Sequence, residues 1–116
     1  MDKKLKDQLS QIKLLICDID GVLTDGSFIK STSGDELRSF NALDGVGFVV
    51  LRLLNLNIKT AWITGRESIT TTQRAEELQI DEVYNGVIRK IDAYNELKKK
   101  YNPVSYTHLT LPTTGI

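Results

Sequence analysis

The sequence predicts an α/β protein with a parallel β-sheet. Three short apolar runs, at 13–20, 58–64 and 82–84, are each suited to a buried strand, and segments with helical periodicity separate them. Polar residues follow each run, as is typical of parallel strands whose carboxyl ends carry a ligand site. A chain of 116 residues has room for one domain with one modest core. We expect helices on both faces of the sheet.

The first third of the chain is expected to hold a helix, a strand and a hairpin. Residues 2–10 are predicted to form a short polar helix on the surface, and 13–20 to form a buried strand that ends in carboxylates. Glycines bound a turn at 21–26. Two extended segments within 27–40 flank the polar loop 31–35, which favours a β-hairpin.

The middle of the chain is more apolar, and a buried helix is expected over 44–56. The hydrophobic residues that set the helical spacing are Val46, Val49, Val50, Leu53 and Leu54. The elements expected after it are a strand over 58–64, a helix capped by Ser68 and ending at Leu78, a strand over 82–84 and a helix over 88–101. The lysines near the end of the last helix suit the helix dipole.

Composition excludes several classes of protein. Lys plus Arg equals Asp plus Glu, 15 of each, so the chain offers neither a basic footprint for nucleic acid nor a polybasic patch for a membrane. Cys17 is the only cysteine, which excludes an internal disulfide and a zinc site built on several thiolates. No apolar run approaches a membrane span, and the charged start is unlike a signal peptide. We expect a cytoplasmic protein with no nucleic acid or membrane partner.

The final segment, 103–116, differs from the rest of the chain. It contains no Asp, Glu, Lys or Arg, and it holds both prolines and the only histidine. Most of it resembles a translated reading frame of a sequencing adapter. We therefore assign 1–102 to the domain, expect the tail to be non-native and to pack poorly, and give His108 no catalytic role. Pro103 and Pro112 argue against a central strand in the tail.

Asp18 and Asp20 stand two residues apart at the tip of the first strand, where an extended backbone points both carboxylates to the same side. Two like charges this close need a cation or a shared proton. A divalent ion that prefers oxygen ligands, such as Mg²⁺, meets that need. Aspartates at strand ends also start turns or cap helices, so the pair alone leaves both interpretations open.

The longer string from Asp18 to Gly26, DIDGVLTDG, resembles the nucleophile motif of the haloacid dehalogenase superfamily of phosphotransferases. The resemblance implies a three-layer, Rossmann-like fold and an aspartyl-phosphate mechanism with Mg²⁺ held at Asp18 and Asp20. Asp18 would attack phosphorus, and Asp20 would protonate the leaving alkoxide and then activate water. Thr64 and Lys90, after the second and third strands, match the superfamily's phosphoryl-binding Thr and its charge-neutralising Lys.

A hairpin directly after this motif, with no large cap domain, narrows the resemblance to the 3-deoxy-D-manno-octulosonate 8-phosphate phosphatase family of lipopolysaccharide biosynthesis. The strings FNALDGVG (40–47), ITGR (63–66) and RAEEL (74–78) support it, and the match covers about 12–101. The family implies a homotetramer in which hairpins associate and neighbouring subunits cover the active site. Its substrate-binding residues would fall on Asp20, Asn41, Ala42, Leu43, Asp44, Gly45, Arg66, Arg74 and Lys90.

Departures from the family leave alternatives open. Leu43 stands where bacterial members often have arginine, so a related nonulosonate phosphate is an alternative substrate. The acidic GDDxxD-like loop expected shortly after residue 102 is absent, so we expect the sheet to lack its last strands and this chain to be nearly inactive. A non-catalytic oligomerisation module, as in sialic acid cytidylyltransferase-type proteins, is another alternative. A receiver-type signalling domain is disfavoured, because the third strand ends in Val83-Tyr84-Asn85 without an acceptor aspartate.

Overall fold

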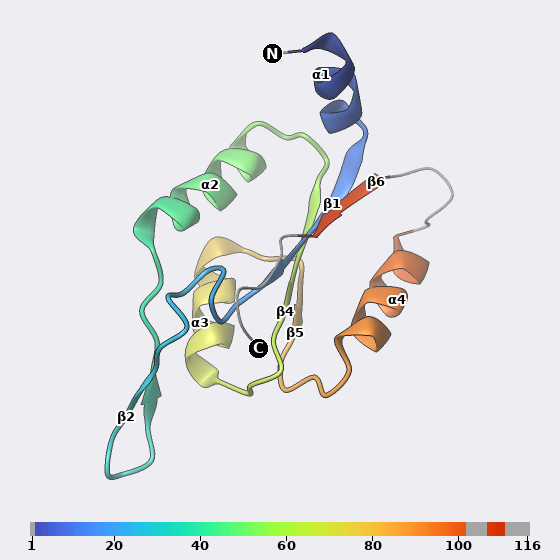
Figure 1. Ribbon diagram of the computed structural model, residues 1–116. Helices are drawn as coiled ribbons and strands as arrows, with labels where there is room; N and C mark the ends of the chain where they lie inside the picture. The colour runs from blue at the N-terminus through green and yellow to red at the C-terminus, as the bar shows by residue number, and fades with distance from the viewer. Residues whose placement is uncertain (1, 102–106, 111–116) are drawn as a thin grey trace.

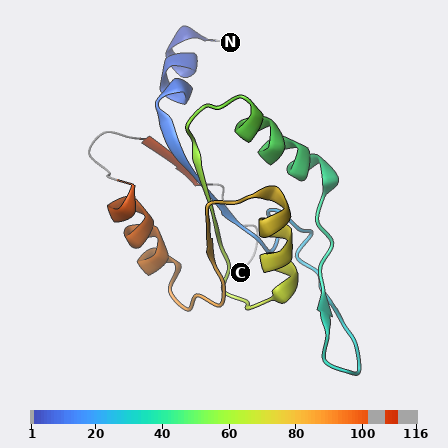
Figure 2. The same ribbon diagram turned by 180° about the vertical axis from the view of Figure 1, so that it is seen from behind.

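Parallel strands form the central sheet of the computed structural model, which describes residues 2–101 and 107–110 (Figure 1). The strand order is β5-β4-β1-β6, and each neighbouring pair is parallel. Helices α2 and α3 cover one face of the sheet and α4 covers the other, as Figure 2 also shows from behind. The expected three-layer α/β fold is confirmed.

Up to residue 101 the elements follow one another in the expected order, and one further strand, which was not expected, lies at Thr107–Thr110. The helices are α1 (Lys3–Ser10), α2 (Ala42–Leu53), α3 (Ile69–Leu78) and α4 (Lys90–Lys100). The strands are β1 (Ile12–Asp18), β2 (Ile29–Lys30), β3 (Glu36–Leu37), β4 (Lys59–Ile63), β5 (Glu82–Tyr84) and β6 (Thr107–Thr110). Helix α2 begins two residues before the predicted start, because Asn41 caps it: its side-chain oxygen accepts a hydrogen bond from the Leu43 amide at 2.8 Å.

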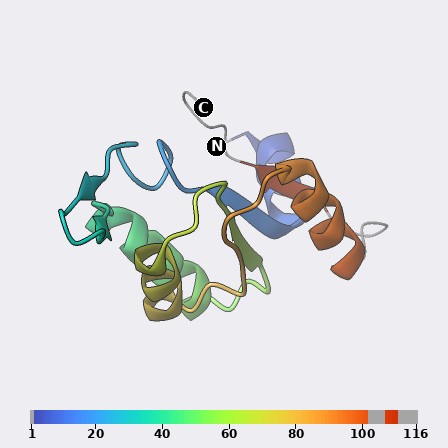
Figure 3. The ribbon, with the colours of Figure 1, turned by 90° about the horizontal axis from the view of Figure 1, so that it is seen from below.

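The register of the sheet brings three strand ends together. Asp18 of β1 pairs with Ile63 of β4, and Ile63 in turn pairs with Tyr84 of β5. Because the strands are parallel, the loops that follow all three emerge at one edge of the sheet. Figure 3 views the molecule from this edge.

Both faces of the sheet are buried, and side chains of β1 alternate between two cores. Leu14 and Ile16 pack with Leu97 of α4 on one side. Cys17 packs on the other side with Trp62 and with residues of α2 and α3. Side chains alternate between the two faces of a strand, and both faces are buried here, so the sequence of β1 is a continuous apolar run.

The predicted hairpin is present as β2 and β3, which pair antiparallel with Ile29 opposite Leu37. An isolated bridge between Thr24 and Phe40 closes its base. In Figure 1 the hairpin projects away from the sheet on the side of α2 and α3. Within the described residues no larger insertion separates β1 from α2, in agreement with the prediction of a hairpin in place of a cap domain.

The prediction that the apolar helix after the hairpin is buried is wrong. Only Gly45 and Phe48 of α2 are buried, whereas Val46 is 58% and Leu53 is 74% exposed. The helix contacts α3 and the sheet along one narrow side, and the opposite side is apolar as well. A helix whose sequence is apolar on all sides is predicted to be buried. The pattern therefore did not distinguish the packed side of α2 from its exposed side.

The expectation that the tail packs poorly is wrong for Thr107–Thr110, and the rest of the tail lies outside the described residues. This segment forms β6 and pairs in parallel with the free edge of β1, Leu109 lying opposite Leu15. Pro103 and Pro112, on which the argument against a strand rested, lie outside the described residues. Pairing satisfies backbone groups of β1 that the strand would otherwise leave open at the edge.

None of the helices in the described part of the chain has the length and apolar content needed to cross a bilayer.

The core between the sheet and α4 predicts a sharp contrast between two substitutions on that helix. Leu97 is fully buried, whereas Ile91 is 51% exposed. Leu97→Ala should lower the free energy of unfolding by about 2–5 kcal/mol, because it leaves a cavity in a closed core. Ile91→Ala should change it by less than about 1 kcal/mol. Chemical denaturation of the variants measures both values, and equal losses would contradict this placement of α4.

Candidate active site

The centre of the candidate site is an ion pair between Asp18 and Lys90. Asp18 is the last residue of β1, Lys90 is the first of α4, and the Lys90 ammonium donates to Asp18 Oδ2 at 2.6 Å. The other carboxylate oxygen accepts the Ile19 amide at 2.9 Å. The Asp18 side chain is 13% exposed, so the pair is shielded but open to one side. The sequence placed both residues in the site, and the structure brings them into contact.

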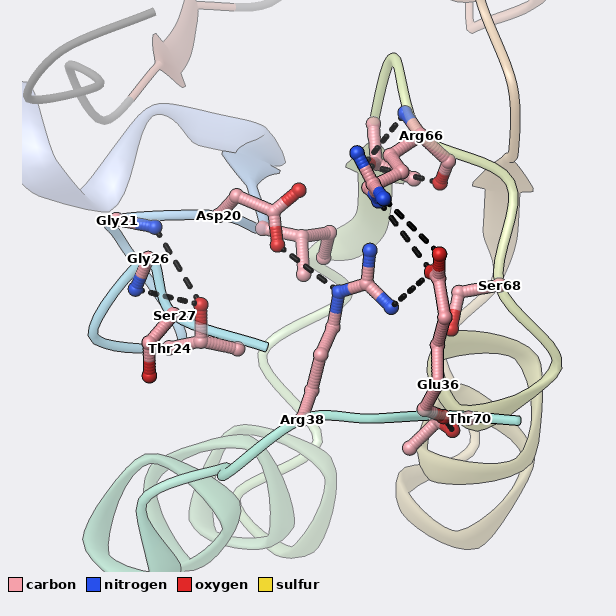
Figure 4. A network of polar contacts seen from close by, with 12 residues as sticks. Asp20, Gly21, Thr24, Gly26, Ser27, Glu36, Arg38, Arg66, Ser68 and Thr70 are labelled. Atoms are coloured by element: carbon pink, nitrogen blue, oxygen red, sulfur yellow. Dashed lines mark hydrogen bonds and ion pairs between the residues drawn. The ribbon is translucent and has the colours of Figure 1, made fainter. Parts of the chain in front are cut away.

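Asp20 does not contact Lys90; its partner is an arginine that the sequence analysis missed. Arg38, just after β3, donates from Nε to Asp20 Oδ1 at 3.0 Å (Figure 4). The Arg38 side chain is only 1% exposed, and Asp20 is 34% exposed. No local pattern signals such a contact, because the two residues are 18 positions apart and Arg38 follows a short strand with no distinctive motif.

The hairpin is tied to the turn after β4 through Glu36. Arg66 donates two hydrogen bonds to the Glu36 carboxylate, at 2.9 and 3.3 Å. Thr70 donates its hydroxyl to the Glu36 backbone carbonyl at 3.1 Å. The Arg66 guanidinium also lies 3.9 Å from the centre of the Phe28 ring. We call these four residues the hairpin latch. The sequence indicated Arg66 as a substrate residue but not its partners here.

Thr64 is held rigidly at the end of β4. It is 2% exposed, its amide donates to the Tyr84 carbonyl at 2.9 Å, and its carbonyl accepts the Val87 amide at 3.0 Å. Its hydroxyl accepts the Arg66 amide at 3.3 Å. The hydroxyl thus lies at the same sheet edge as Asp18, as the motif predicted.

The expected capping role of Ser68 is only partly correct. Ser68 occupies the cap position of α3, but its hydroxyl makes no capping hydrogen bond and has no partner among the described residues. The side chain of Asn85, which follows β5, makes hydrogen bonds to the Ser68 backbone instead. Its side-chain oxygen accepts the Ser68 amide at 3.0 Å and its nitrogen donates to the Ser68 carbonyl and to the Thr72 hydroxyl.

The segment from Asn41 to Gly45 lies beside the turn after β1, next to a cavity of about 290 Å³. The cavity is lined by Val22, Leu23, Thr24, Asp25, Ser39, Phe40, Asn41 and Asp44. Leu43 points to solvent and is 77% exposed.

Arg74 belongs to α3 and adjoins one of the other predicted substrate residues. It packs against Gly45 at the contact of α2 with α3 and pairs with Glu77 at 3.0 Å. Within the described residues, no hydrogen bond or ion pair joins Arg74 to Asp18 or Lys90.

Two observations bear on the metal and the nucleophile. Among the described residues, no group of three or more His, Cys, Asp or Glu side chains is placed to hold a metal ion. Each of the two carboxylates is paired with a different cation, Asp18 with Lys90 and Asp20 with Arg38. Burial, helped by the charges of Asp44 and Asp18, raises the pKa of the Cys17 thiol to about 12. Cys17 is thus a neutral core residue and not a competing nucleophile.

Comparison with known proteins gives a consistent likeness, although no protein-family model matches the chain. The chain is 42% identical over 88 residues to the 3-deoxy-D-manno-octulosonate 8-phosphate phosphatase of Yersinia pestis, a match that covers 76% of this chain and 46% of that protein. The chain therefore spans about half the length of the curated relatives it matches.

Solved structures show the same relationship. The phosphatase of the same name from Moraxella catarrhalis, in complex with magnesium, phosphate and KDO, has a TM-score of 0.77 and 35% identity, over 87% of this chain and 57% of that one. A structure from Legionella pneumophila, described as a haloacid dehalogenase superfamily hydrolase of subfamily III A, has a TM-score of 0.76 and 39% identity, over 84% and 53% of the two chains.

The fold, with these likenesses, is that of the haloacid dehalogenase superfamily. Within the superfamily, the chain resembles the 3-deoxy-D-manno-octulosonate 8-phosphate phosphatases.

Two glycines of α2 allow a test of how Arg74 is placed. A Cβ added at Gly45 would collide with the end of the Arg74 guanidinium, whereas nothing lies within 4 Å of a Cβ at Gly47. Gly47→Ala should stabilise the helix by about 0.5–1 kcal/mol through its better helix propensity. Gly45→Ala should lose that gain and displace Arg74. Denaturation curves and the Arg74 side-chain NMR signals measure the two effects, and identical behaviour of both variants would contradict the packing described.

The hairpin latch should respond to acid. Hydrogen bonds from Arg66 hold the pKa of Glu36 below its ordinary value of 4.5. A lowered pKa means that the latch is intact above pH 4.5 and is lost as the pH falls through the lowered value. In Arg66→Gln the Glu36 titration should move up toward 4.5. The carboxyl carbon shift of Glu36, followed by NMR, reports both midpoints; the same midpoint in both proteins would exclude the latch.

Proposed function

We propose that the site hydrolyses a phosphomonoester with the help of Mg²⁺ and through an aspartyl-phosphate on Asp18. The observation that carries the proposal is the contact between Asp18 and Lys90 at the sheet edge, where Thr64 also lies. The Lys90 ammonium lies 2.6 Å from the Asp18 carboxylate, and such a cation offsets the repulsion between a carboxylate nucleophile and an incoming phosphate dianion.

The reaction balances with the residues present. An Asp18 oxygen attacks phosphorus, the bond from phosphorus to the ester oxygen breaks, and Asp20 gives its proton to the leaving alkoxide. In the second half Asp20 takes a proton from water, the water oxygen attacks phosphorus, and Asp18 is released with inorganic phosphate. The Thr64 hydroxyl and the Lys90 ammonium bind the phosphoryl oxygens throughout.

The residues fit a magnesium site in part. Asp18 and the main-chain carbonyl of Asp20 would hold the ion, and Mg²⁺ is commonly bound through one or two carboxylates together with substrate phosphate. Bound there, the ion would offset negative charge on the phosphoryl oxygens. In the part of the chain that the structure describes, no group of three or more His, Cys, Asp or Glu side chains is placed to hold a metal ion, so we expect weak metal binding and slow turnover by this chain.

The substrate we favour is 3-deoxy-D-manno-octulosonate 8-phosphate, because the relatives that match this chain carry that name. Asn41, Ala42, Leu43, Asp44 and Gly45, with Arg66, Arg74 and Lys90, would bind it. A related nonulosonate phosphate is the alternative, since the exposed Leu43 offers no cation for the sugar carboxylate. Parallel assays of the two sugar acid phosphates distinguish them.

The hairpin supports a proposal of self-association, in the form of the expected homotetramer. Its apolar side chains project outward: Phe28 is 43%, Ile29 is 68% and Leu37 is 56% exposed. Apolar groups gathered on a projecting element favour a protein contact. A purely non-catalytic oligomerisation module would also use this surface, but it would have no need of the Asp18–Lys90 pair. Sedimentation velocity measures the association.

The nucleophile proposal predicts that Asp18→Asn reduces Mg²⁺-dependent phosphate release by about 10³-fold or more, because an amide is a poor nucleophile. Asp7→Asn, on the exposed helix α1, is the matched control and should retain the parent rate. Release of phosphate from the sugar acid phosphate, followed with a sensitive dye, gives both rates. A parent chain no faster than Asp18→Asn would contradict the catalytic proposal.

A further inference from the structure

Arg38 has an environment that structural stability alone does not explain. Its side chain is 1% exposed, yet Nη1 and Nη2 have no hydrogen-bond partner within the described residues. Nη1 lies 3.6 Å from a Glu36 oxygen, and the guanidinium carbon lies 5.8 Å from the centre of the Phe28 ring. Buried donors without acceptors are unfavourable, and an apolar side chain of similar length would avoid them. The one hydrogen bond that the guanidinium makes within the described residues is therefore the contact that needs explaining.

That bond goes to Asp20. Nε donates to Oδ1 at 3.0 Å, and Figure 4 shows the second oxygen of the carboxylate directed away from the guanidinium. Arg38 lies between Asp20 and Glu36 in the same view, so an acidic group contacts it on each side. The guanidinium is buried between the two carboxylates, and its hydrogen bond from Nε restrains the orientation of a carboxylate that is itself 34% exposed.

We propose that Arg38 is a positioning residue for Asp20: it occupies one carboxylate oxygen and thereby holds the other toward the reacting ester oxygen. The inference rests on the proposed function, in which Asp20 carries the proton. This proposal gives the hairpin a role within its own chain, because Arg38 directly follows β3 and contacts Asp20. General acid catalysis depends on a carboxyl group held within hydrogen-bonding distance of the leaving oxygen.

A competing explanation is that Arg38 only anchors the hairpin through Glu36. Glu36→Gln separates the two explanations, since it weakens the hairpin latch and the contact to Nη1 but leaves the bond from Nε to Asp20. Arg38→Met removes the bond to Asp20 and keeps the length of the side chain. Arg38→Lys keeps the charge and one donor, and it serves as the conservative rescue.

The first measurement does not depend on activity. Three-bond NMR couplings to the Asp20 carboxyl carbon give the rotamer populations about its first side-chain torsion. We expect one dominant rotamer in the parent and in Glu36→Gln, averaging over rotamers in Arg38→Met, and partial recovery in Arg38→Lys. Arg38→Gln, a shorter neutral variant, is read in the same way if Arg38→Met does not fold. A single rotamer in folded Arg38→Met or Arg38→Gln would overturn the proposal. Averaging that occurs in Glu36→Gln but not in these variants would overturn it as well.

The second measurement uses the leaving group. An alkyl phosphate needs proton donation to its poor leaving alkoxide, whereas p-nitrophenyl phosphate needs little. Arg38→Met should therefore lose about tenfold more rate on the alkyl ester than on the aryl ester, and Glu36→Gln should affect both equally. Equal losses on both esters in Arg38→Met would assign Arg38 a structural role only. If neither this chain nor a version extended with the C-terminal third of a relative releases phosphate, the proposed function is refuted, and the couplings then still decide the role of Arg38.

Discussion

The parallel register of β1, β4 and β5 is the constraint on which the site depends. Asp18, Ile63 and Tyr84 are aligned across the three strands, so the residues that follow each strand meet at one edge. Burial of both faces fixes this register, because a slip by one residue would turn every core side chain of β1 to the wrong face. Hydrophobic packing thus sets the distance between a carboxylate and an ammonium that are 72 positions apart.

The hairpin adds a second, polar constraint to this frame. Glu36 connects it to Arg66 in the turn after β4, and Arg38 connects it to Asp20 in the turn after β1. Two adjacent turns of the sheet edge are therefore linked by one inserted element. A short hairpin can make both links because side chains in an extended segment alternate between its two sides. Glu36 and Arg38 are two residues apart, so they lie on the same side.

Much of this arrangement could be predicted from the sequence, and the misses have physical causes. The strands and the Asp18, Thr64 and Lys90 positions have local signatures, namely apolar runs and polar residues at their ends. Arg38 has none, since a contact between a hairpin residue and a strand tip depends on how the hairpin folds back. The exposure of α2 was missed because periodicity identifies apolar sides but not which of them has a neighbour. The strand at Thr107–Thr110 was missed because backbone pairing at an open edge requires little of the side chains.

The position of Cys17 gives the chain a reporter of local opening next to its candidate nucleophile. The thiol is 1% exposed, it is the only one in the chain, and it adjoins Asp18 in the centre of the sheet. A thiol reagent can react only when β1 separates from α2 and α3, and the raised pKa makes any partly shielded thiol slow to react. The rate of labelling therefore follows the opening of one layer of the fold and not the fraying of its ends. Ligands that tighten the sheet edge would slow that rate, so binding could be followed through a single sulfur atom without any probe being added to the site.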